Sequence, residues 1–137
     1  MPQFLVHLSG IQPTQLYISQ AKLAAVQSLL ANGGINGLEP IPVGRLGDAL
    51  VSTDGHTRMV AARLAGHTHV KAVWETDELD WEAYEICVRW CREEGIRTAQ
   101  DLVGRVVSEQ EYESLWLARC RRMHDDLQRH RDANGCI

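Results

Sequence analysis

Residues 52–58 read Ser52-Thr53-Asp54-Gly55-His56-Thr57-Arg58, and they connect two apolar segments of different character. Residues 49–51 are typical of a strand, whereas the alanine-rich residues 59–65 are typical of a helix. A glycine in such a turn lets the backbone approach a ligand closely. The free N–H groups at the start of a helix attract anions. With three polar side chains at positions 56–58 as further donors, the turn is predicted to bind an anion, most often a phosphate.

Two interpretations of this turn remain open at the level of residue types. In the functional one, Arg58 forms a fork to phosphate oxygens, the N–H groups of Gly55, His56 and Thr57 contact the same group, and Asp54 holds Mg²⁺ or orients the histidine. In the structural one, Thr57 or Asp54 only caps the helix and Arg58 pairs with an acid. A further candidate is Glu39, which is either a carboxylate facing the site or a solvated loop charge.

The segments around the turn predict a small α+β unit over residues 11–75. We expect an edge strand at 4–6, an extended segment at 38–43, a hairpin turn at Gly47-Asp48, a returning strand at 49–52 and a third strand at 69–74. Ser19 is a candidate N-cap for a helix that runs to Ala31. The predicted buried side of this helix consists of Leu23, Val26, Leu29 and Leu30.

Residues 77–137 are expected to be helical, which divides the chain into a core at 1–76 and an extension at 77–137. Asp77 or Asp80 can cap a helix over 81–94, and residues 98–101 and 108–111 have the form of capping boxes. The second box opens a long helix whose apolar stripe comprises Tyr112, Leu115, Trp116, Cys120, Met123 and Leu127. We expect the extension to pack on the core or on a second subunit, and the apolar 81–91 helix is compatible with a homodimer.

Composition narrows the classes of function. The formal charge of −4 argues against general nucleic-acid binding. No apolar stretch approaches the roughly 18 residues of a membrane helix, and the N-terminal residues do not follow the pattern of a secretory signal. We therefore expect a cytoplasmic protein with reduced cysteines.

Cysteines and a histidine recur at one-turn spacing in the extension, as Cys87 with Cys91 and Cys120 with His124. Facing each other, the two pairs could form a zinc site. The favoured interpretation is that these thiols are buried and act as small hydrophobic groups, because they share faces with aromatic and apolar residues.

The segments Glu39-Pro40-Ile41-Pro42-Val43 and Asp54-Gly55-His56-Thr57-Arg58-Met59-Val60-Ala61-Ala62, followed by Gly66 and Val70, resemble the ParB/sulfiredoxin superfamily. The resemblance covers residues 11–75, about half of the chain. It implies a sulfiredoxin-like fold that binds a nucleotide (ATP, ADP or CTP) through the turn, with Mg²⁺. The whole chain also resembles an uncharacterised bacterial ParB-like family with the same helical tail.

Activities within this superfamily diverge, and the residues discriminate among them. Sulfiredoxins carry a reactive cysteine in the turn where this chain has His56. Partition proteins carry more basic turns and a DNA-binding helix-turn-helix. The free serine kinases share the Asp-Gly-His turn, but Gln15 stands where the resemblance places their catalytic glutamate, and glutamine cannot act as a general base.

The resemblance thus implies one of two functions, while a third, DNA binding of the partition type, is disfavoured by the charge balance. The first is a phosphotransferase or NTPase with Asp54 and His56 at the phosphates, Glu39 as acid or base, and a small-molecule acceptor. The second is a non-catalytic nucleotide-sensing module in which the same turn binds but no group transfers a proton.

Overall fold

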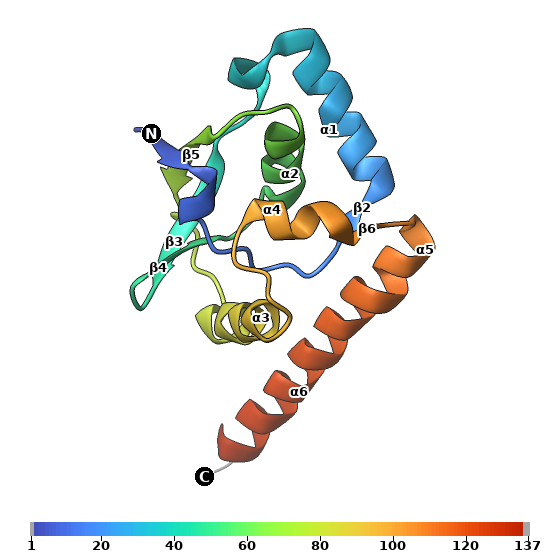
Figure 1. Ribbon diagram of the computed structural model, residues 1–137. Helices are drawn as coiled ribbons and strands as arrows, with labels where there is room; N and C mark the ends of the chain where they lie inside the picture. Colours follow the sequence, from blue (N-terminus) through green and yellow to red (C-terminus); the bar gives the residue numbers. More distant parts are fainter. Residues whose placement is uncertain (1, 136–137) are drawn as a thin grey trace.

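The computed structural model describes residues 2–135 and has an α+β fold built around a mixed four-stranded sheet (Figure 1). The sheet order is β1-β5-β3-β4, with β1 at Phe4–His7, β5 at His69–Trp74, β3 at Ile41–Leu46 and β4 at Ala49–Ser52. The β3–β5 pair is parallel, and the β1–β5 and β3–β4 pairs are antiparallel. This arrangement confirms the predicted fold class, the edge strand and the hairpin.

Helix α2 (His56–Leu64) connects β4 to β5 and covers one face of the sheet. Its buried Met59 and Ala62 pack with Ile41, Val43 and Ala72 of the sheet in one hydrophobic cluster. Helix α1 (Gln20–Gly33) lies along α2. The short connections include 3₁₀ turns at Leu8–Gly10, Ile35–Gly37 and Val103–Arg105. The start of α2 is therefore held between the sheet and α1.

Local capping signals fix where the helices begin. Ser19 Oγ accepts a hydrogen bond from Lys22 N at 3.2 Å, as predicted for the N-cap of α1. Asp80 caps α3 (Trp81–Glu93) by accepting from Ala83 N at 3.3 Å. Thr98 opens α4 (Ala99–Leu102) with a capping box, and Ser108 caps α5 (Glu109–Glu111). All four predicted caps are confirmed.

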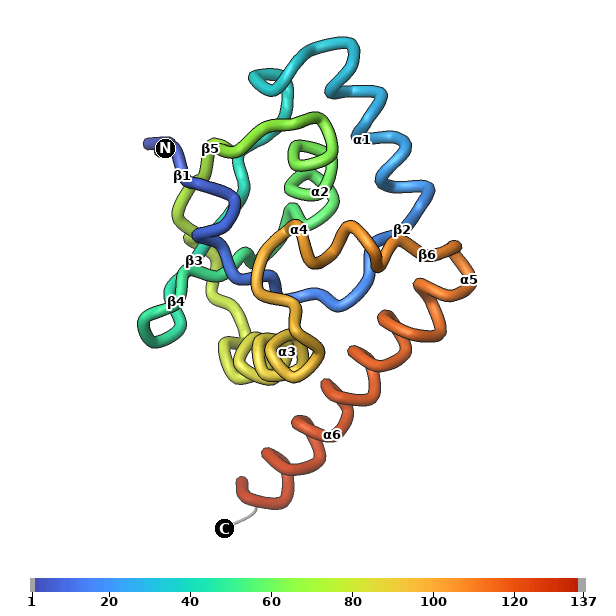
Figure 2. The backbone as a smooth tube through the Cα atoms, viewed as in Figure 1, coloured from blue at the N-terminus to red at the C-terminus, as the bar shows by residue number. Residues whose placement is uncertain are grey.

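The C-terminal helix is continuous from α5 to the end of α6 (Ala118–Gly135), but its path includes a π-helical turn at Tyr112–Leu117 (Figure 2). Tyr112 and Trp116 are buried within this turn, and Met123 and Leu127 are buried beyond it. Leu115, which the predicted apolar stripe included, is 41% exposed. The wider spacing of the π turn takes Leu115 out of the buried face.

A second, very small sheet joins the N-terminal and C-terminal halves of the chain. Strand β2 (Ile18–Ser19) pairs in parallel with β6 (Val106–Val107). Around it, one large hydrophobic cluster includes Leu16, Ile18 and Val60 from the first half of the chain, and Leu102, Tyr112 and Trp116 from the second. The helical extension therefore packs on the core of the same chain.

The buried side predicted for α1 is partly wrong. Leu23 and Leu30 are buried, but Val26 is half-buried and Leu29 is 62% exposed. The reason is that α1 is covered along one side only, where it packs on α2, so its neighbouring face borders an open pocket.

Two of the contacts that position α3 lie at its first residues. The ring of Trp81 lies so close to Gly44 that a Cβ placed there would be 2.5 Å from the ring. Farther along, Arg131 donates to Asp80 and to Glu82, which joins the end of α6 to the start of α3. Within residues 2–135, none of the helices has both the length and the hydrophobicity needed to cross a bilayer.

Candidate functional site

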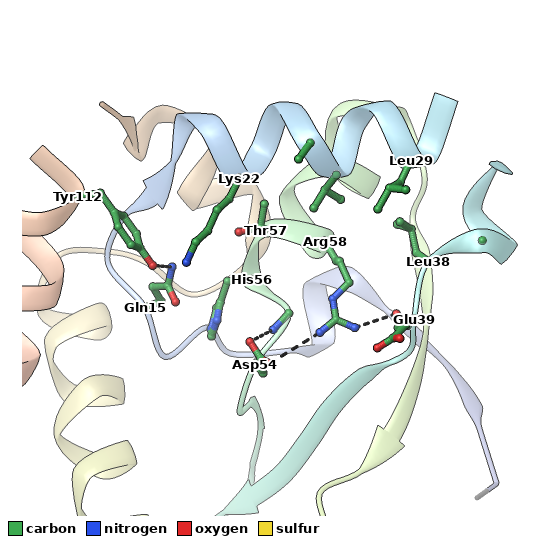
Figure 3. Close-up of a pocket in the computed structure, with 14 residues that line it drawn as sticks. Gln15, Lys22, Leu29, Leu38, Glu39, Asp54, His56, Thr57, Arg58 and Tyr112 are labelled. Atoms are coloured by element: carbon green, nitrogen blue, oxygen red, sulfur yellow. Dashed lines mark hydrogen bonds and ion pairs between the residues drawn. The ribbon is translucent and has the colours of Figure 1, made fainter. Parts of the chain in front are cut away.

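A pocket of about 620 Å³ opens at the start of α2 (Figure 3). Its floor is the Asp54–Arg58 turn, one wall is α1, and the other walls come from residues 37–39 and the C-terminal helix. Every residue that the sequence singled out for the site lines this pocket, namely Glu39, Asp54, Gly55, His56, Thr57 and Arg58. The chain fold thus brings Glu39, which is distant in sequence, to the turn.

The N-terminus of α2 has unpaired backbone donors. The N-cap is Gly55, with φ of 81°, and no side chain caps the helix. Within residues 2–135, the N–H groups of His56, Thr57 and Arg58 make no hydrogen bond. The Asp54 carboxylate instead accepts from Gly55 N at 2.8 Å. The interpretation in which Asp54 or Thr57 merely caps the helix is therefore wrong, and the donors remain available to an anion.

His56 is held as a neutral hydrogen-bond donor. Its side chain is buried, and Nε2 accepts from Thr14 N at 2.9 Å and lies 2.8 Å from Ser52 Oγ. Burial lowers the pKa of His56 from 6.5 to about 4, with nearby Arg58 also lowering it and Asp54 opposing the shift. Because Nε2 accepts from a backbone N–H, the ring proton is on Nδ1.

The Nδ1–H group of His56 is free to contact a ligand. Nδ1 makes no hydrogen bond within the described part of the chain, and no fully buried side-chain nitrogen there lacks a partner. Nδ1 therefore keeps a small accessible surface, on a side chain that lines the pocket. The arrangement suits donation of a hydrogen bond better than proton abstraction, because the acceptor nitrogen is already occupied.

Arg58 contacts the protein with one arm of its guanidinium group. Nη1 donates to the backbone oxygens of Glu39 at 3.1 Å and Pro40 at 2.8 Å, and Nη2 lies 4.0 Å from Asp54 Oδ2. The predicted pairing with an acid is thus long and weak. The guanidinium group, which was expected to bind phosphate, is thus attached through Nη1 to the wall of the pocket. Nη2 is the nitrogen that lies beside Asp54 on the pocket floor.

Lys22 is a site residue that the sequence prediction missed. Its ammonium group lies 5.4 Å from the centre of the Tyr112 ring and pairs with no carboxylate within residues 2–135. Lys22 points into the pocket from α1, where Ala25, Val26 and Leu29 continue the same wall. A sequence signal for this face exists, because Lys22, Ala25, Val26 and Leu29 follow the i, i+3, i+4, i+7 spacing of one side of a helix.

Gln15 and Tyr112 form the wall beside Lys22. Gln15 Nε2 donates to Tyr17 O at 2.8 Å and to the Tyr112 hydroxyl at 3.1 Å. Gln15 therefore lies in the pocket, at the position that the resemblance assigns to a catalytic glutamate. Tyr112 reaches the site from the C-terminal helix, and no local sequence signal indicated that contact.

The carboxylates of the pocket are exposed. Asp54 has a side chain that is 81% exposed, and Glu39 is also exposed, with its backbone oxygen rather than its carboxylate bound to Arg58. Within residues 2–135, no three acidic, histidine or cysteine side chains form a group that could hold a metal ion. Magnesium at Asp54 would therefore take most of its ligands from a bound phosphate and water.

The zinc alternative has little structural support. The fully buried Cys91 donates its thiol to Gln15 O at 3.5 Å, and burial raises the pKa of Cys87 and of Cys91 to about 12. Buried, protonated thiols of this kind act as small hydrophobic groups. The two pairs at 87/91 and 120/124 do not come together as a ligand set among the described residues.

Comparison with known proteins gives a structural neighbour for the fold but no information on the function. No protein-family model and no curated protein matches the chain. Among solved structures, the crystal structure of protein Atu1540 from Agrobacterium tumefaciens is similar, with a TM-score of 0.51 and 15% identity over 74% of this chain and 61% of that chain. The chain thus spans less than two thirds of that protein. At this level of identity, the likeness establishes a shared fold alone.

Proposed function

We propose that this protein binds a nucleotide (ATP, ADP or CTP) with its phosphates at the N-terminus of α2, as the resemblance to the ParB/sulfiredoxin superfamily implies. The observation that supports this most directly concerns the N–H groups of His56, Thr57 and Arg58, which have no partner among residues 2–135. They lie at a pocket that also holds the ammonium group of Lys22, which no carboxylate of those residues pairs. Backbone donors, a helix dipole and a lysine together are typical of phosphate-binding sites.

The shape of the pocket favours a nucleotide over inorganic phosphate. Its volume of about 620 Å³ is within the range of sites for small organic ligands. Beyond the donors, the wall is apolar, because Ala25, Val26, Leu29 and Leu38 line it. Leu29 is 62% exposed without a ligand, and a base or sugar lying on this wall would cover it.

Magnesium has a role in this arrangement. The exposed carboxylate of Asp54 lies on the same pocket floor as the phosphate donors, and without a cation it would repel the phosphates. A Mg²⁺ ion bridging this carboxylate and phosphate oxygens would convert that repulsion into attraction.

Two versions of the function are compatible with the pocket. In a phosphotransferase or NTPase, the exposed carboxylate of Glu39 accepts the proton of a small-molecule acceptor or of water, while Asp54 holds the Mg²⁺. In a non-catalytic sensing module, the nucleotide is only bound. The module is favoured by Gln15, an amide hydrogen-bonded to Tyr112 where the kinases have a carboxylate, and by the occupied Nε2 of His56.

Calorimetric titration with ATP, ADP, CTP and GTP, each with Mg²⁺, tests the proposal. Lys22→Ala should weaken binding by about tenfold or more, because it removes a charged partner of the phosphates. The matched control is Lys71→Ala, since Lys71 is the chain's other lysine and is exposed on β5 outside the pocket. Absence of nucleotide binding, or equal effects of the two substitutions, would refute the proposal.

The same samples distinguish the two versions. Phosphate release that is lost in Glu39→Gln or Asp54→Asn would identify an enzyme, whereas binding without turnover would identify a sensor. Arg58→Ala should lower both nucleotide affinity and stability, because Arg58 holds the Glu39–Pro40 wall.

A further inference from the structure

A second cavity, of about 340 Å³, adjoins the proposed phosphate site. Gln15, Asp54 and His56 line both spaces, so these residues form the partition between them. The remaining walls come from α3 and the two residues before it, from the C-terminal helix, and from Thr14 and Thr53. A ligand in it would therefore lie next to whatever the turn at 54–58 binds.

The walls of this cavity belong to the folded interior. Ala83 and Cys87 of α3, and Trp116 and Met123 of the C-terminal helix, are each less than 8% exposed. Sulfur atoms and the Trp116 ring make these walls apolar and polarisable, which suits a compact hydrocarbon or aromatic body.

The first pocket combines basic with acidic residues, whereas the charged residues of the second cavity are acidic, with His124 beside them. No lysine or arginine lines it, whereas Lys22 and Arg58 line the first. Its acidic residues are Asp80, which is already paired with Arg131, and Asp54, whose side chain is 81% exposed. The thiols add no negative charge, since burial raises the pKa of Cys87 to about 12 and that of Cys120 to about 11.

We propose that this second cavity binds a small organic amine, with its apolar body against Trp116 and Met123 and its ammonium group at Asp54. An ammonium group meets a carboxylate there, whereas an anionic ligand would be repelled. The position of the amine beside a nucleotide's phosphates rests on the proposed function; the occupation of the cavity itself does not. The Mg²⁺ ion that the proposed function places at Asp54 would compete with the ammonium group for the same carboxylate, so the amine and a nucleotide with Mg²⁺ should each weaken the binding of the other.

The test uses three probes of similar size: phenethylamine, 2-phenylethanol and phenylacetate. Protein labelled with ¹³C at the methionine methyl groups reports on the cavity, because Met123 lines it and Met59 lies in the sheet core. We expect phenethylamine to shift the Met123 signal and to leave the Met59 signal in place. Affinity should fall from the amine to the alcohol to the carboxylate.

Two substitutions test whether the amine binds in the second cavity. Cys120→Phe fills the cavity from α6 and should weaken phenethylamine binding by about tenfold or more. Its control is Leu117→Phe, since Leu117 is exposed on the same helix and lines neither space. Asp54→Asn, at an exposed position, should reduce the preference for the amine over the alcohol by about threefold. An unchanged Met59 signal shows that each variant is folded.

The outcomes separate this inference from the proposed function. Binding of the amine that is lost in Cys120→Phe supports the inference, even if no nucleotide binds and the proposed function fails. Nucleotide binding with no shift at Met123 from any probe refutes the inference and leaves the proposed function intact. Phenylacetate binding as tightly as phenethylamine, or Leu117→Phe weakening binding as much as Cys120→Phe, also refutes it. When both ligands bind, saturating ATP with Mg²⁺ should lower the affinity for phenethylamine, and an unchanged affinity would contradict the placement of the ammonium group at Asp54.

Discussion

His56 illustrates how burial decides the role of a single residue. A histidine in a ligand-binding turn is readily interpreted as a proton carrier, because its ordinary pKa is close to neutrality. Here the backbone N–H of Thr14 occupies one ring nitrogen, and burial disfavours the charged ring. The residue is thereby fixed in one tautomer, with a single N–H available at the pocket edge.

The lowered pKa of His56 predicts that the protein loses stability in mild acid. Because the folded pKa of about 4 lies below the ordinary value of 6.5, the unfolded chain takes up the proton first. The contribution is fully present above about pH 6.5 and is lost as the pH falls towards 4, by up to roughly 3 kcal/mol. Urea unfolding of the wild type and of His56→Gln, whose amide oxygen can still accept from Thr14, measures the effect. The difference in the free energy of unfolding between the two proteins should become smaller on acidification. A difference that does not change with pH would contradict this account of His56.

At the scale of the elements, the helices were predictable where a local signal marks their start. Ser19, Asp80, Thr98 and Ser108 each cap a helix through a contact within three residues. The β2–β6 pair was not predictable, because each strand has two residues and Ile18 meets Val106 only in the folded chain. Pairings so distant in sequence leave no periodic pattern.

The residues of the candidate site also differ in whether a local sequence signal could predict them. The turn at 54–58 was predicted from its residue types, and all of its members line the pocket. Lys22 and Tyr112 were missed because packing between elements brings them there. Leu29 was assigned to the buried side since an apolar residue at helical spacing usually faces the core, yet it borders an open pocket.

The docking of α3 on the sheet depends on Gly44. A methyl group at this position would meet the Trp81 ring at 2.5 Å, so Gly44→Ala should lower the free energy of unfolding by about 1–3 kcal/mol. Gly104→Ala is the control, because nothing lies within 4 Å of the added Cβ there. In the background Trp81→Leu, the cost of Gly44→Ala should largely disappear, as chemical denaturation of the single and double variants can show. Simple additivity would argue against this contact.

At the scale of the whole molecule, the two halves of the chain share one interior. Leu16 and Ile18 pack in the same cluster as Leu102 and Trp116, and Glu109 accepts a hydrogen bond from Ser19 at the start of α1. The C-terminal helix also supplies a wall of both ligand spaces, through Tyr112 and Trp116. The extension is thus part of the site as well as of the core.

This shared interior predicts that the protein unfolds as a single unit. Thermal unfolding followed by tryptophan fluorescence, which reports mainly on the second half, should coincide with unfolding followed by far-ultraviolet circular dichroism. A chain of residues 1–76 alone should not unfold cooperatively, since it would expose Leu16, Ile18 and Val60. Two separate transitions, or a cooperatively folded fragment, would show instead that residues 1–76 are an independent domain.

The π turn at Tyr112–Leu117 sets the rotational phase of everything that follows it. A π turn takes up one residue more than an α turn, so ordinary α-helical pitch over the same residues would rotate all downstream residues by about 100°. Arg131 would then swing away from Asp80, and Met123 would leave the second cavity. The one extra residue in the π turn therefore determines which side of α6 faces α3.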